Sequence, residues 1–168
     1  MKRTLIAALA MIAALSKPVL AWEVDIETSL MDDSTNVFMY VVADEPNLSA
    51  QPGPYYTPEL WIRCLEGVTE IFVVFGGHDM AGYGENPVIY RIGAEAAQQT
   101  TRSALDTSHE ALSLEDVTGS GLNFVKSLLG HDRFVIQATP SGEIPIRATF
   151  DTTGIDQAII PLRESCGW

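Results

Sequence analysis

Basic residues are scarce in this 168-residue chain, which carries 10 Lys and Arg against 22 Asp and Glu and has a formal net charge of −12 at pH 7. So strong a negative charge repels the phosphates of nucleic acids and of anionic lipids. Both classes of partner are therefore disfavoured. The acidity helps to keep an exported protein soluble, and it also suits a basic patch on a protein partner.

Long apolar runs are absent except near the first residue. Lys2-Arg3 forms a basic start, residues 5–15 are apolar, and Val19-Leu20-Ala21 forms a small-residue cleavage site. This pattern is typical of a secretory signal peptide. The run is also shorter than the ~20 residues that a transmembrane helix needs. We expect residues 1–21 to be a signal peptide that is cleaved after Ala21. The rest of the chain should then be an exported protein that is not inserted into a membrane.

The remaining residues, 22–168, have the length of one domain (168 minus 21 gives 147 residues). A domain of this size buries about 70% of its unfolded surface, which is enough for a core without a metal. Loss of Lys2, Arg3 and Lys17 leaves 7 basic against 22 acidic residues, a net charge of −15. We therefore predict a single, strongly acidic exported domain.

Cysteine is nearly absent: the chain has only Cys64 and Cys166. Exported cysteine pairs are usually oxidised, so we predict a disulfide between them. The bond closes a loop of about 100 residues and would contribute ~4 to 5 kcal/mol by constraining the unfolded chain. Oxidised sulfurs cannot act as nucleophiles.

Motifs for nucleophilic or nucleotide chemistry are also missing. Ser120 lies in a Gly-Ser-Gly triplet, which is one residue short of a nucleophile elbow and follows no apolar strand. Gly82-Tyr-Gly84 begins like a dinucleotide fingerprint, but Pro87 stands where the last glycine belongs. We predict no catalytic residue and no cofactor.

The three histidines, His78, His109 and His131, each precede a carboxylate. They could in principle supply zinc ligands. Adjacent residues on a strand point to opposite faces, however, and all three lie in predicted loops. Residues 32–36 offer calcium-like oxygen ligands but lack the glycine and the distant glutamate of a calcium loop. We interpret all these segments as polar turns and predict no metal site.

Short apolar segments between turn residues predict a mainly β protein. Residues 22–28 alternate apolar and acidic side chains, which predicts a strand with one buried face. Hairpins are predicted over residues 22–43, 60–75 and 133–151, and further strands at 87–92 and near 98–105.

Two short helices complete the prediction. Apolar residues at helical spacing indicate a helix over residues 121–129, with Ser120 as its cap and Gly130 as its stop. Residues 153–156 resemble a capping box before a second helix. The expected fold is a β-sandwich or a strongly curved antiparallel sheet, with two short helices and one disulfide.

Three aromatic residues are candidates for a binding surface: Tyr55, Tyr56 and Trp61. Exposed aromatics often dominate the energy of protein interfaces. The alternative is that they cover the core beneath the proline-rich loop of residues 45–58. The sequence leaves both interpretations open.

Several motifs resemble the type VI secretion system-associated family called VasI or TagO. They cover nearly all of the mature chain: Met31-Asp-Asp-Ser34, Leu60-x-Ile-Arg-Cys64, Val88-x-Tyr-Arg91, Thr139-Pro140, Ala148-Thr-Phe-Asp151, Gly154-Ile-x-x-Ala158, Pro161-Leu-Arg163 and Cys166-Gly-Trp168. In the middle, Thr101-Arg-Ser-Ala-Leu105 replaces the tryptophan, serine and acid pattern that the family tends to carry.

The resemblance implies a periplasmic accessory protein encoded beside a contractile injection machine, without an agreed enzymatic activity. We therefore expect it to bind a protein partner in the cell envelope, such as a type VI secretion component. Two alternatives stay open: a β-sandwich that binds a glycan or small ligand, and an unrecognised hydrolase with paired carboxylates in a cleft.

Overall fold

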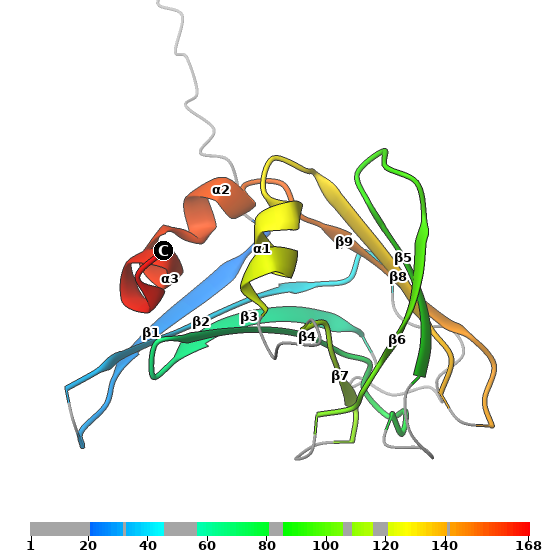
Figure 1. Ribbon diagram of the computed structural model, residues 1–168, viewed down its shortest axis with the longest axis horizontal. Coiled ribbons are helices and arrows are strands. Elements are labelled where there is room, and N and C mark those ends of the chain that lie inside the picture. The colour runs from blue at the N-terminus through cyan, green and yellow to red at the C-terminus, as the bar shows by residue number, and fades with distance from the viewer. Residues whose placement is uncertain are drawn as a thin grey trace, which may run out of the picture.

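The computed structural model describes residues 21–31, 33–45, 57–80, 86–105, 109–115, 121–140 and 142–168. Their strands form two antiparallel sheets, and three short helices accompany them (Figure 1). This confirms the predicted fold class. Most of the expected signal peptide, together with Tyr55, Tyr56, Gly82, Gly84 and Ser120, lies outside the described residues.

The first sheet has five strands in the order β1-β2-β3-β4-β7. Their bounds are Glu23–Thr28 (β1), Thr35–Val42 (β2), Glu59–Leu65 (β3), Val68–Val74 (β4) and Ala111–Ser113 (β7). The predicted hairpins β1–β2 and β3–β4 are both present. Glu66 and Gly67 join β3 to β4 with φ of 49° and 77°. A two-residue turn with positive φ at both positions matches the twist of a hairpin.

The second sheet has four strands in the order β6-β5-β8-β9. They are Asn86–Ile92 (β5), Gln98–Arg102 (β6), Arg133–Ala138 (β8) and Ile146–Asp151 (β9). The predicted β8–β9 hairpin is confirmed. Pro87 lies near the start of β5, where its missing N–H is tolerated although the strand is interior.

The described residues form three helices, rather than the two expected: α1 (Leu122–Leu128), α2 (Ile155–Ala158) and α3 (Ile160–Cys166). Pro161 does not end the helical segment because a proline in the first turn loses no helical hydrogen bond. The expected capping box is wrong: the residue preceding α2 is Gly154, without a side-chain cap. The N–H of Thr153 instead donates to the Asp151 carboxylate at 2.9 Å. No helix in the described part of the chain is long and apolar enough to cross a membrane.

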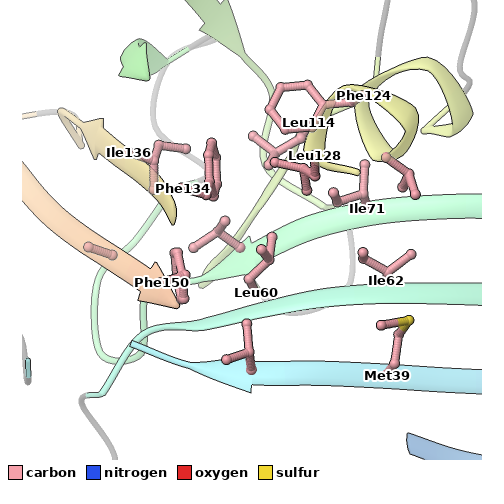
Figure 2. Close-up of a cluster of buried hydrophobic side chains, with 14 of the residues drawn as sticks. Met39, Leu60, Ile62, Ile71, Leu114, Phe124, Leu128, Phe134, Ile136 and Phe150 are labelled. Carbon is pink, nitrogen blue, oxygen red and sulfur yellow. The ribbon is translucent and has the colours of Figure 1, made fainter. Parts of the chain in front are cut away.

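The two sheets enclose one apolar core. In Figure 2, the side chains of Leu60, Ile62 and Ile71 lie on the face of the first sheet that is turned towards α1. Phe134 and Phe150 of the second sheet lie on that same side. These side chains are fully buried. The helices and the second sheet lie on the same side of the first sheet (Figure 1), and α3 packs mainly on β2 and β3. The opposite face of the first sheet is covered by no described element.

Two predictions about strands need correction. All six residues of β1 are exposed, so the expected burial of one face is wrong. Alternating apolar and acidic residues show that a strand has two different faces, but one face is buried only where another element covers it. Here α3 packs on β2 and β3 and does not cover β1. The short strand β7 was not expected, because residues 111–113 are too few for a recognisable pattern. It is held by pairing with β4 and by a bridge between Ala104 and Leu112.

The last residues of the chain are tied to the first sheet. Cys64 of β3 and Cys166 of α3 form the predicted disulfide, with their Cα atoms 5.8 Å apart. The indole N–H of Trp168 donates to Thr69 Oγ1 at 2.9 Å. Lys126 and Arg163 lie 5.5 Å and 5.2 Å from the same ring. The disulfide and the tryptophan therefore hold α3 against the sheet and link it to α1.

Candidate functional site

The uncovered face of the first sheet carries aromatic and acidic side chains in place of an ordinary polar surface. Strand alternation places them together on one side, since their neighbours on β2, β3 and β4 point into the core. We call this the aromatic–acidic face and define it by Glu23, Asp25, Glu27, Phe38, Tyr40, Glu59, Trp61, Arg63, Glu70, Phe72 and Val74.

Three aromatic rings form a ladder across the middle of this face. The register pairs Tyr40 with Trp61 and Trp61 with Phe72. The centroids of Tyr40 and Trp61 are 4.5 Å apart, those of Trp61 and Phe72 are 6.3 Å apart, and both pairs are stacked. Aromatic pairs of this kind contribute about 0.5–1.5 kcal/mol beyond area burial. Because Tyr40 and Phe72 flank Trp61, another ring lies on each side of its indole.

A second row lies beside the ladder and ends in an ion pair. The register aligns Asp25, Phe38, Arg63 and Glu70. Arg63 Nε donates to the Glu70 carboxylate, and the guanidinium lies 5.1 Å from the centre of the Phe72 ring. The positive charge of Arg63 is therefore paired with a carboxylate of the same face, and the Arg63 side chain is only 29% exposed.

The carboxylates dominate the electrostatics of the face, with five of them against the single guanidinium. Glu23 accepts a hydrogen bond of 2.5 Å from the Tyr40 hydroxyl, and Glu59 accepts one of 2.7 Å from the Trp61 indole. The bond to Glu23, followed by burial and the nearby negative charges, raises the pKa of Tyr40 above its usual value. These contacts orient the rings and leave a net negative surface.

A shallow depression of about 540 Å³ lies over the face. Ring edges and Val74 make its floor apolar, and Asp25, Glu27 and Glu59 contribute carboxylates. Lysine and arginine have long apolar stems and charged heads, so they match a floor and rim of this kind. A sugar that stacked on Trp61 would need an open ring face, and it would meet the ring of Tyr40 on one side of the indole and that of Phe72 on the other. The geometry therefore favours basic side chains over glycans.

Of the three aromatic candidates, the structure describes only Trp61, and it lies at the centre of the ladder. Its side chain is half-buried on the face turned away from the core, so it does not act as a cover of the core. Tyr55 and Tyr56 lie outside the described residues. Whether Trp61 binds a partner stays a prediction.

The histidines lie apart from this face. His78 is buried, and its Nδ1 is 2.7 Å from a carboxylate oxygen of Glu143. His131 Nε2 lies 3.9 Å from the Glu95 carboxylate, and His109 is exposed in a turn with a φ of 56°. Within the described ranges, no three His, Cys, Asp or Glu side chains gather as a metal site would require.

Most of the aromatic–acidic face was not predicted from the sequence, although the sequence of β2 contains a signal for it. Residues 37–43 are apolar almost without interruption, whereas a strand with one wet face should alternate. The extra apolar residues, Phe38 and Tyr40, lie on the outer side. The ladder itself needs the register of three strands, which the sequence does not display.

The fold and this face define a disulfide-linked, two-sheet β protein whose first sheet leaves an aromatic and acidic surface open. Residues 20–168 match the family described as "Type VI secretion system VasI, EvfG, VC_A0118", and the chain belongs to this family. It is thus a type VI secretion-associated protein. Neither the curated proteins nor the solved structures contain a match to it.

Proposed function

We propose that this protein works in the periplasm as an accessory of type VI secretion and that it acts by binding a basic protein partner of the cell envelope, without catalysis. Family membership supports the link to secretion, and the signal-peptide pattern of residues 1–21 supports export. The observation that carries the proposal is the open aromatic–acidic face.

Its composition suits a protein interface better than a solvated surface. Trp61 and Tyr40 belong to the residue types that are enriched in the centres of interfaces. Five carboxylates surround them, so a partner with Lys and Arg would be attracted over a distance and then held by local pairs. The rings are already stacked and hydrogen-bonded to Glu23 and Glu59, which lowers the entropy lost on binding.

The proposal is tested by co-purification from envelope extracts, with the captured partner identified by mass spectrometry. Recovery should fall as salt rises, because the Debye length shrinks from about 10 Å at 0.1 M to about 3 Å at 1 M. Trp61→Ala and Asp25→Lys should each reduce recovery of the same partner by about tenfold or more.

The matched control is Glu164→Lys, which makes the same kind of charge change at an exposed position of α3. It should leave recovery unchanged, because α3 lies on the opposite side of the sheet. Equal losses for Asp25→Lys and Glu164→Lys would mean that only total charge matters. Hydrolysis of peptidoglycan or of esters, abolished by one carboxylate substitution, would replace the proposal with the hydrolase alternative.

A further inference from the structure

Strand β1 is an edge of the first sheet and has one unpaired side. Among the described strands it pairs only with β2, and all six of its residues are exposed. Every second residue of an edge strand directs its N–H and C=O away from the sheet. Such an edge accepts an extended segment of another protein as an added strand.

The core-side face of β1 carries an apolar row that nothing described covers. Val24 and Ile26 are 40% and 54% exposed, whereas their cross-strand partners Met39 and Val37 are buried. Trp22, on the same side, is also buried at 5% exposure. The apolar inner surface of the sheet therefore continues onto the edge strand, and an added strand could extend it further.

The outer side of β1 carries a row of carboxylates, Glu23, Asp25 and Glu27. Asp25 and Glu27 also line the depression over the aromatic–acidic face. A second copy of this chain added here would place acidic rows side by side, and like charges in cross-strand positions destabilise a sheet. The charge therefore selects a basic occupant over self-association.

We propose that an extended segment of the partner, with basic and apolar residues in alternation, adds to β1 as a sixth strand of this sheet. Its basic side chains lie opposite the carboxylate row, and its apolar side chains lie against Val24 and Ile26. Its backbone bonds to the free edge. This inference rests on the proposed function and adds the location and the sequence pattern of the partner segment.

The test measures how tightly three synthetic peptides bind to the protein expressed from its full sequence. The peptides have equal length and the same set of side chains. One alternates Lys and Val, one groups the same residues in two blocks, and one alternates but carries N-methyl groups on every second amide. The alternating peptide should bind about tenfold or more tightly than either of the others. Its binding should also slow hydrogen exchange in residues 23–28.

A pair of substitutions tests the apolar row separately from charge attraction at the outer face. Ile26→Asp should weaken the binding of the alternating peptide by about tenfold. Ile144→Asp is the matched control, since Ile144 is an exposed isoleucine of the β8–β9 connection at 68% exposure, and it should have no effect. Both residues are exposed, so melting temperatures near that of the unchanged protein should verify that the variants fold.

Three outcomes would overturn the inference. Equal binding of the alternating, block and N-methylated peptides would mean capture by charge alone, which leaves the proposed function intact. If the envelope partner is captured but hydrogen exchange in residues 23–28 does not change, the partner binds at another surface. A dimer in solution that Ile26→Asp dissociates would mean that a second copy occupies the edge.

Discussion

Tyr40 shows how a single side chain joins the two properties of the aromatic–acidic face. Its ring stacks on Trp61, while its hydroxyl donates to Glu23 of the neighbouring strand. The bond fixes the first ring of the ladder and also uses one carboxylate of the edge strand. Since the pair lies at the surface, its contribution to the free energy of unfolding is about 0–1 kcal/mol.

The raised pKa of Tyr40 leads to a prediction about pH. A group whose pKa is higher in the folded than in the unfolded state stabilises the fold below its unfolded pKa, here about 10, and loses this contribution as pH rises through the folded pKa. The stability difference between the unchanged protein and Tyr40→Phe should therefore be constant from about pH 7 to 9 and shrink above about pH 10.

Ultraviolet titration of tyrosine ionisation checks the cause. The tyrosine whose ionisation disappears in Tyr40→Phe should have a pKa above the usual tyrosine range. Glu23→Gln should lower the pKa of Tyr40 towards that range. Glu27→Gln, on the same strand but without a bond to Tyr40, is the control and should leave it unchanged. If Tyr40→Phe removes a tyrosine that ionises in the ordinary range, the role given to Glu23 is wrong.

At the scale of elements, the packing of α1 on β4 depends on one close approach. Gly121 precedes α1 with φ −75°, so its backbone conformation does not require glycine. Its missing side chain does matter, because a Cβ atom there would lie 2.9 Å from the N of Ile71 and 3.0 Å from the O of Thr69. The Gly121 N–H also donates to the Thr69 carbonyl at 3.2 Å.

Gly121→Ala should therefore destabilise the protein by about 1–3 kcal/mol, because backbone atoms of β4 must move to accommodate the methyl group. Gly121 is also the N-cap of α1, where glycine is preferred to alanine, so the change of cap residue acts in the same direction. Chemical denaturation measures the difference. Ser127→Ala, at an exposed position of the same helix, is the control. It removes the hydrogen bond of 2.6 Å that the Ser127 hydroxyl donates to the Phe124 carbonyl, but alanine has the higher helix propensity, so stability should change by less than about 0.5 kcal/mol. A stabilised Gly121→Ala variant would show that the helix does not approach β4 so closely.

Elements also differ in how well the sequence predicts them. The β3–β4 and β8–β9 hairpins were predicted because a turn and two short apolar segments lie within about twenty residues. The exposure of β1 and the existence of β7 were not, because both depend on neighbours that are distant in sequence. The last helical segment divides into α2 and α3 just before Pro161, which has no N–H to extend the hydrogen bonds of α2.

On the scale of the whole molecule, the disulfide joins segments 102 residues apart and fixes α3 to β3. The covalent loop contains β4, β7, the whole second sheet, α1 and α2, whereas β1 and β2 precede it. Constraint of the unfolded chain by so long a loop is the main source of its expected stabilisation. The bond also keeps Trp168 beside Thr69 and the cations of Lys126 and Arg163.

Replacement of Cys64 and Cys166 together by alanine should lower the free energy of unfolding by about 2–5 kcal/mol. Reduction of the unchanged protein should produce a similar loss, which serves as the chemical control. Thiol labelling of the denatured, unreduced protein should find no free cysteine. Two reactive thiols, or equal stability of the double variant, would contradict the proposed role of the disulfide.

The hairpins, the cysteine pair and the family motifs were readable from residues alone because each is local or has no alternative partner. Cys64 had only Cys166 to pair with, and Glu66-Gly67 has the residue types of a tight turn. The aromatic–acidic face and the open edge of β1 came only with the tertiary structure. Tyr40, Trp61 and Phe72 are separated by 21 and 11 positions, and they meet because long-range hydrogen bonding sets the register of three strands.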